Sequence, residues 1–149
     1  MSPPETLLNQ VGLKHEALTE KIIKAFYSVY NELGHGFLEA VYEEAMAISL
    51  REAGFNVARQ YPVAVWFHQH KAGEFKADLV VENLVLVELK AVQSLDASHH
   101  AQIINYLNAT EFEVGLLLNF GPKPEIQRRM LDNDRKKALP LCAKAQASV

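Results

Sequence analysis

The chain has 149 residues, of which 49% are hydrophobic and 22% charged, and its formal net charge is −3. This length and composition predict one globular domain, covering residues 1–149, with a substantial core. No apolar run approaches the roughly 20 residues that span a membrane, and no secretion signal is visible. The single cysteine, Cys142, excludes an internal disulfide and an all-cysteine zinc site. We expect a cytoplasmic protein without a membrane partner, and the net charge argues against non-specific coating of DNA.

The first part of the chain predicts a flexible arm followed by two helices. Residues 1–15 are polar and contain prolines, as in a loosely held arm. Apolar residues recur at helical spacing from about residue 19 to 33 and, after a Gly-His-Gly turn, from about residue 38 to 53. The side chains expected to face inward on the second helix are Val41, Ala45 and Ile48, with Tyr42 as a further candidate.

The middle of the chain predicts three strands. Residues 57–67 alternate loosely and include Pro62, which favours an edge or bulged strand. A polar turn is expected at residues 68–72. It precedes two apolar strands, at residues 73–81 and 85–92.

The last third predicts a helix, a buried strand and a charged helix. Residues 94–109 have helical spacing, and residues 114–120 form a continuous apolar run typical of a buried strand. A short charged helix is expected at residues 125–137, and a loose tail at residues 138–149. The order α-α-β-β-β-α-β, then α, predicts an α/β or α+β domain around a mixed sheet.

Three charged residues interrupt the two central strands. Asp78 lies in the first of them, and Glu88 and Lys90 lie two residues apart in the second, so Glu88 and Lys90 share a face. Burying a charge costs several kcal/mol unless it is paired or holds a metal ion. We therefore expect these residues to carry chemistry. The alternative is an internal salt-bridge network.

The loop between these strands decides whether the two acids can meet. Directly opposed residues of an antiparallel pair share a face. A three-residue loop at residues 82–84 would place Asp78 opposite Glu88, whereas a two-residue turn would place it opposite Val87. A shared metal ion therefore requires an odd loop or a bulge. The alternative is a plain two-residue hairpin with Asp78 at a strand edge in water.

Two carboxylates and a backbone carbonyl would form a hard oxygen site suited to Mg²⁺ or Mn²⁺. Such an ion polarises a phosphoryl oxygen and lowers the pKa of bound water. A neighbouring lysine can orient that water or offset charge in the transition state. The pattern thus favours hydrolysis of a phosphate ester.

Other polar residues are weaker candidates. Glu39 opens the second predicted helix, where an acid also favours the helix dipole. Gln102 and Tyr106 are four residues apart and share a helix face, but they also fit a polar flank with a half-buried tyrosine. Neither closely spaced histidine pair has the geometry and further ligands of a zinc site.

Taken together, the motifs resemble the GxxExxY protein family, a branch of the PD-(D/E)xK nuclease superfamily. The Gln-x-x-x-Tyr segment is also similar to a helix motif of the RecB-like exonuclease branch. The matching positions are Gly36, Glu39, Tyr42, Asp78, Glu88, Lys90, Gln102 and Tyr106. Two positions depart from the family pattern: Ala77 and His35 stand where proline is expected. The joint match spans roughly residues 19–121.

The resemblance implies a restriction-endonuclease-like core, in which helices flank a mixed central sheet. It further implies that Gln102 and Tyr106 touch substrate phosphate or steady Lys90. The Mg²⁺ (or Mn²⁺) site that it implies comprises Asp78, Glu88, the Leu89 carbonyl and Glu39, the last by metal or water contact.

Three functions are compatible with these features. The first is a metal-dependent nuclease that hydrolyses phosphodiester bonds of DNA or RNA with metal-activated water. The second is a catalytically silent nuclease fold that serves as a binding or assembly module, and the third is a hydrolase of small phosphorylated molecules. The intact set of Asp78, Glu88, Lys90, Glu39 and Gln102 favours the nuclease, whereas the acidic net charge and the lack of an added DNA-binding region favour the alternatives. Nucleic acid is the expected partner, and a homo-oligomer is compatible with the sequence.

Overall fold

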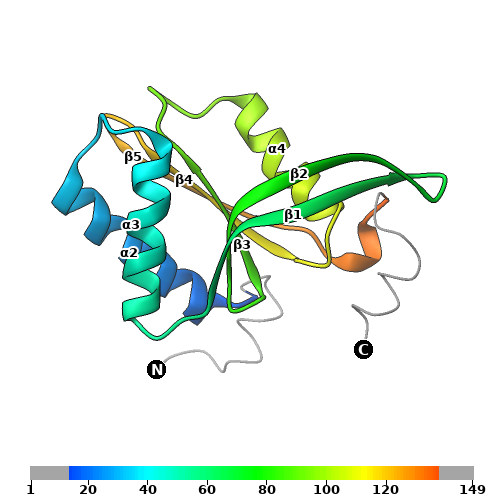
Figure 1. Cartoon of the computed structure of the whole chain (residues 1–149), viewed down its shortest axis with the longest axis horizontal. Coiled ribbons are helices and arrows are strands. Elements are labelled where there is room, and N and C mark those ends of the chain that lie inside the picture. Colours follow the sequence, from blue (N-terminus) through cyan, green and yellow to red (C-terminus); the bar gives the residue numbers. More distant parts are fainter. Residues whose placement is uncertain (1–13, 138–149) are drawn as a thin grey trace, which may run out of the picture.

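Helices and strands follow one another in a simple order over residues 14–137, the part of the chain that the computed structural model describes (Figure 1). In chain order the elements are α2 (Glu16–Leu33), α3 (Glu39–Glu52), β1 (Val57–Phe67), β2 (His70–Val81), β3 (Val85–Lys90), α4 (Ala97–Asn108), β4 (Val114–Phe120), β5 (Pro124–Met130) and the 3-10 helix η1 (Asn133–Arg135). The expected tail, and all of the expected arm except Lys14 and His15, lie outside the described residues. No described helix is long and apolar enough to cross a membrane.

The strands form one mixed sheet in the order β1-β2-β3-β4-β5. Neighbouring strands are antiparallel except β3 and β4, which are parallel. Parallel neighbours need a crossover connection, and α4 provides it. The strand that contains Pro62 lies at the sheet edge, as the proline predicts.

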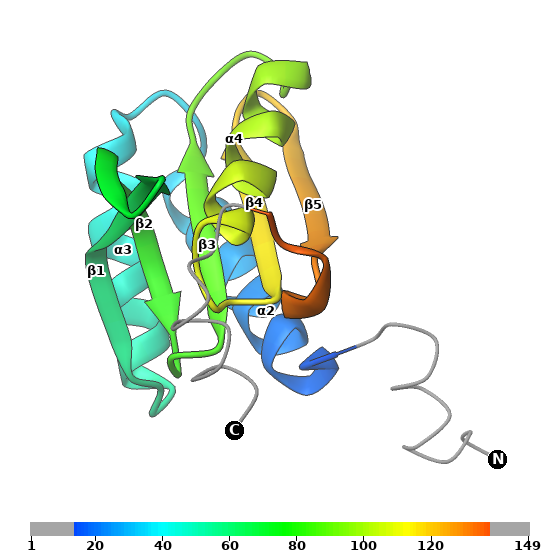
Figure 2. The ribbon, with the colours of Figure 1, turned by 90° about the vertical axis from the view of Figure 1, so that its right-hand side faces the viewer.

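Helices cover both faces of this sheet. Figure 2 shows α4 in front of the sheet, with α2 and α3 behind it. On the side of α2 and α3, Phe26 and Tyr42 pack with Leu116, and on the side of α4, Ile103 packs with Leu117. The two adjacent leucines thus point to opposite cores, which explains why β4 is apolar throughout. The expected α/β fold of restriction-endonuclease type is confirmed.

The charged segment after Pro124 is the strand β5, so the helix predicted at residues 125–137 is wrong. This strand pairs with β4 in antiparallel register, with Leu118 opposite Ile126. The apolar residues of the segment, Ile126 and Met130, are four apart and pack on the core of α2 and α3. A spacing of four places residues on one face of a helix and also of a strand. Pairing with a buried strand decides between them.

The inward face predicted for α3 is wrong at Val41 and Ile48. Ala45 packs on the core as predicted, and the further candidate Tyr42 is buried. Val41 and Ile48 are 40% and 47% exposed, whereas Tyr42 and Met46 are fully buried. Both sets have helical spacing, so the sequence offers two apolar stripes of similar strength. Packing against α2 and the sheet selects the stripe that carries the larger side chains.

The hairpin between β1 and β2 is longer than predicted and projects beyond the rest of the molecule (Figure 1). The turn consists of His68 and Gln69, with φ of 47° and 65°, and β2 begins directly after it. Two consecutive residues with positive φ form the tight turn that matches strand twist. The Asn-Gly pair that usually marks such a turn is absent here. The polar residues predict a turn of five residues, 68–72, but the turn has only two, and β2 is correspondingly longer than predicted.

The alternation of side chains in β1 inverts at Gln60. Val57 packs on the core of α2 and α3, but Tyr61, four residues on, packs on the core of α4. In a regular strand these two residues would share a face. Gln60 has a φ of 51° and stands opposite Asp78, because the pairs on either side of it are in register. The inversion therefore falls beside the acid that the sequence singled out.

Candidate active site

The loop between β2 and β3 has the odd length that the metal hypothesis requires. The register pairs Leu79 with Val87 and Val81 with Val85, which leaves the three residues 82–84 as the loop. The same register sets Asp78 opposite Glu88. The two acids thus lie together where the two strands stop pairing, and the plain two-residue hairpin is excluded.

Side chains replace the backbone ladder at this point. The Asp78 N–H donates to Glu88 Oε1 at 3.0 Å, and the Leu89 N–H donates to Asp78 Oδ2 at 2.8 Å. Each acid is therefore held by the backbone of the opposite strand. This reciprocal arrangement fixes both carboxylates without using their remaining oxygens.

Burial and proximity weaken the acidity of both groups. Burial, followed by repulsion from Asp78, raises the pKa of Glu88 to about 8. Burial, together with the charges of Glu43 and Glu39, raises the pKa of Asp78 to about 6, against the hydrogen bond from Leu89. Lys90 acts in the opposite direction on both acids. The site concentrates negative charge that a single lysine offsets in part.

Two acids of α3 face the same place from the other side. Glu39, Glu43 and Asp78 line one cavity of about 220 Å³, together with Gln60. Glu39 is exposed, so it contacts solvent as well as lining this cavity. Glu43 is 8% exposed. The acid that the sequence flagged is thus the outer of the two.

Sequence reasoning missed Glu43, although its spacing of four from Glu39 places both on one helix face. Its carboxylate accepts from Arg59 Nη2 at 2.8 Å, and the Gln60 amide donates to its other oxygen. Arg59 also pairs with Glu44. The inner acid is therefore held between α3 and β1, next to the inversion at Gln60.

The Gly-x-x-Glu-x-x-Tyr motif shapes the loop that leads into α3. Gly36 has a φ of 113°, which side-chain-bearing residues rarely adopt. The Tyr42 hydroxyl donates to the Gly34 carbonyl at 2.7 Å and accepts from the Phe37 N–H at 3.2 Å. Its ring stacks on Phe120 at 4.1 Å. The glycine and tyrosine thus set where the first residue of α3, the glutamate, begins.

We predict that Tyr42→Phe lowers the free energy of unfolding by about 1–2 kcal/mol, because two backbone groups lose their partner. Denaturant unfolding followed by circular dichroism measures the change. Tyr27→Phe is the matched control, because the Tyr27 ring is 42% exposed on α2. Equal stabilities for the two variants would show that the hydroxyl does not anchor the loop.

The helix α4 brings two further candidates to the opposite side. Gln102 Nε2 donates to the Tyr106 hydroxyl at 3.2 Å. Burial, and then the charge of Glu88, raises the pKa of Tyr106. Asp96 caps the helix, and His99 completes the capping box, so this histidine has a structural role. Tyr106 thus lies close enough to the two carboxylates for their charge to raise its pKa.

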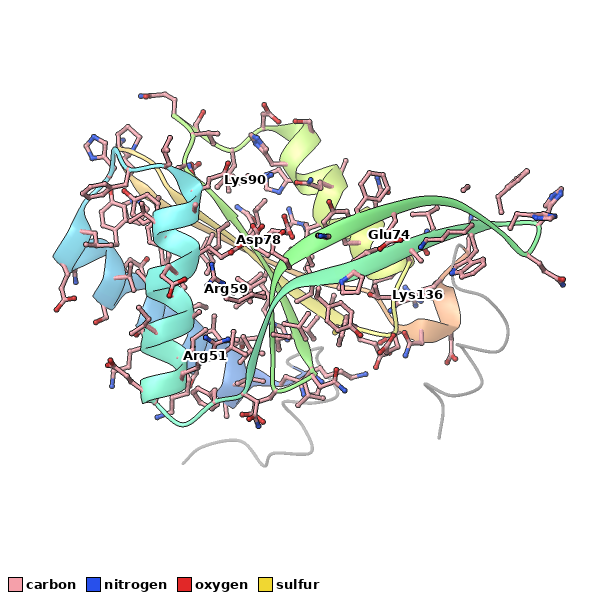
Figure 3. The ribbon with its side chains drawn as sticks, in the orientation of Figure 1. Arg51, Arg59, Glu74, Asp78, Lys90 and Lys136 are labelled. Atoms are coloured by element: carbon pink, nitrogen blue, oxygen red, sulfur yellow. The ribbon has the colours of Figure 1, made fainter. Side chains whose placement is uncertain are left out.

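The lysine stands at the end of β3, directly before the chain turns away. Figure 3 shows Lys90 and Asp78 in the space between α3 and α4, with Arg59 beside α3. Asn119 is opposite Lys90 in β4, fully buried, and its amide clamps Val92 through both the N–H and the carbonyl at 3.0 Å. This clamp, which the sequence did not indicate, fixes the chain just beyond the lysine.

The two acids provide carboxylate oxygens, which are ligand atoms that suit a divalent cation. Asp78 Oδ1 and Glu88 Oε2 accept no hydrogen bond from the described residues. A cation would offset both the burial and the mutual repulsion of these acids. Within residues 14–137 no group of three or more His, Cys, Asp or Glu side chains is arranged to hold an ion. An ion here would therefore rely on the pair, a backbone carbonyl and water.

Comparison with known proteins agrees with this geometry. A family model described as the PD-(D/E)XK nuclease superfamily matches residues 16–129. Because the match covers most of the chain, the protein belongs to the PD-(D/E)XK nuclease superfamily. No curated protein and no solved structure matches the chain.

Proposed function

We propose that the protein is a metal-dependent nuclease that hydrolyses phosphodiester bonds of DNA or RNA. The observation that carries this proposal is the cross-strand pair of Asp78 and Glu88, with Lys90 beside it. Two neighbouring acids whose pKa values are raised by burial and mutual repulsion lower the stability of the fold, which a catalytic role would explain. The superfamily match supports a nuclease-like function. We further assign the chain to the GxxExxY branch, on its Gly-x-x-Glu-x-x-Tyr motif.

Asp78, Glu88 and the Leu89 carbonyl would hold Mg²⁺ or Mn²⁺, with Glu39 in contact through water. The ion would polarise the scissile phosphoryl group and lower the pKa of attacking water. Lys90 would orient that water or offset charge on the phosphoryl oxygens.

On the other side of the site, the Gln102–Tyr106 pair would hold a phosphate oxygen of the substrate, or steady Lys90. We further propose that residues 1–149 act as one domain in the cytoplasm, with nucleic acid as partner.

A cleavage assay with Mn²⁺ on linear, nicked, single-stranded and branched DNA, and on RNA, tests this proposal. Wild type should cut at least one substrate, and Asp78→Ala should lose both cleavage and metal binding by titration calorimetry. Asp134→Ala, which removes an exposed acid of η1, is the matched control and should behave as wild type. Metal binding without cleavage of any substrate would instead favour the silent binding module.

A further inference from the structure

A groove lies between the β1–β2 hairpin and α4, next to the candidate active site. Its volume is about 520 Å³, and Phe75, Gln102, Asn105, Tyr106 and Asn108 are among the residues that line it. We call it the α4 groove. Gln102 and Tyr106 both line this groove. Burial, and then the charge of Glu88, raises the pKa of Tyr106, which places the groove near the acid pair.

Two neighbouring aromatic rings line the α4 groove. Phe75, on β2, is 50% exposed, and Tyr106, on α4, is 8% exposed. Their ring centroids lie 6.0 Å apart at 34°. An exposed ring beside a buried one offers a flat apolar surface on which a third ring can stack.

Neutral hydrogen-bonding groups supply the rest of the polar lining. Asn105 is exposed, and its side chain makes no hydrogen bond to the described residues. Gln102 uses its amide N–H toward Tyr106, which leaves its carbonyl oxygen available. Amide side chains beside aromatic rings recognise the edges of unpaired bases.

Charge indicates the direction in which a polyanion would leave the active site. On the α3 side, the cavity is lined by Glu39, Glu43 and Asp78. The α4 groove has no acidic residue in its lining. Repulsion therefore disfavours a phosphate chain along α3 but not along α4.

We propose that the α4 groove binds an unpaired nucleobase of a single-stranded nucleic acid, with Phe75 as the stacking platform and Asn105 as a base-edge contact. A base paired within a duplex cannot enter such a groove. The inference rests on the proposed function, and it names the substrate class as single-stranded.

Fluorescence anisotropy with short labelled oligonucleotides, with Ca²⁺ in place of Mg²⁺, tests the groove without requiring cleavage. Phe75→Ala should weaken binding of single-stranded DNA or RNA roughly 5- to 100-fold, because stacking of one base has about that effect. Phe75→Tyr should restore it. Phe67→Ala is the matched control: Phe67 is 65% exposed on the same hairpin and stacks on His68 outside the groove. It should bind as wild type does.

The outcomes separate this inference from the nuclease proposal. Binding that depends on Phe75, without any cleavage, would support the groove and contradict the nuclease. Cleavage by a protein whose Phe75→Ala variant binds as tightly as wild type would contradict the groove alone. A wild type that prefers duplex to single strands, or that binds neither, would also overturn the inference. Comparing the affinities for single-stranded DNA and RNA then shows whether the groove prefers deoxyribose or ribose strands.

Discussion

Lys90→Ala should lose most of the turnover, roughly 10²-fold or more, and keep its affinity for Mg²⁺. The lysine contributes no ligand to the ion, so its removal leaves the two carboxylates in place and takes away a like charge. A positioned group that transfers a proton or offsets charge is worth about this factor. Asp78→Ala should instead lose metal affinity and turnover together.

Titration calorimetry with Mg²⁺ and single-turnover cleavage with saturating Mn²⁺ separate the two effects. Lys123→Ala is the matched control, because Lys123 is exposed in the turn between β4 and β5. Cleavage by Lys90→Ala at the wild-type rate would show that the lysine is structural and that the proposed mechanism is wrong.

Glu88→Gln should stabilise the metal-free protein at alkaline pH while abolishing metal binding. The pKa values of Glu88 and Asp78, about 8 and about 6, exceed those of the unfolded chain. Between the unfolded and folded values, the folded state holds protons that the unfolded state has released. The free energy of unfolding of wild type therefore falls as pH rises from about 5 to about 8. Glutamine cannot ionise, so the variant should lose much of this slope.

Thermal unfolding in EDTA from pH 5 to pH 9 measures this effect. Above pH 8 the variant should melt about 5 °C or more above wild type, a shift worth one to two kcal/mol in a chain of this size. Mg²⁺ should then raise the Tm of wild type but not of the variant. Glu52→Gln, at the exposed end of α3, should follow wild type. A variant with the wild-type slope would mean that Glu88 does not titrate as its burial indicates.

Both predictions concern the charge balance of one site. The acids that a cation needs repel each other when the cation is absent, and burial amplifies the repulsion. The backbone of the opposite strand holds each carboxylate in place, so the protein cannot relieve the strain by moving them apart. Stability and function are thus expected to change in opposite directions when an acid is removed.

Local sequence patterns determined most of the elements and the chemical core. The apolar run of β4, the edge proline of β1 and the spacing of Glu88 and Lys90 are properties of neighbouring residues, which a period of two or 3.6 describes. For the loop between β2 and β3, the alternation of side chains along a strand left two alternatives, a loop of two residues or one of three. The candidate set of Asp78, Glu88 and Lys90 could therefore be named without coordinates.

The tertiary structure decided what periodicity leaves ambiguous. The spacing of Ile126 and Met130 fits both a helix and a strand, and only pairing with β4 distinguishes them. The sequence did not single out Glu43, which packing buries against Arg59. The inversion at Gln60 has no local signal, because glutamine carries no preference for positive φ. The face on which a side chain lies, the strand with which a segment pairs and the burial of a residue all depend on contacts between distant segments. The pattern of residues along one segment does not contain this information.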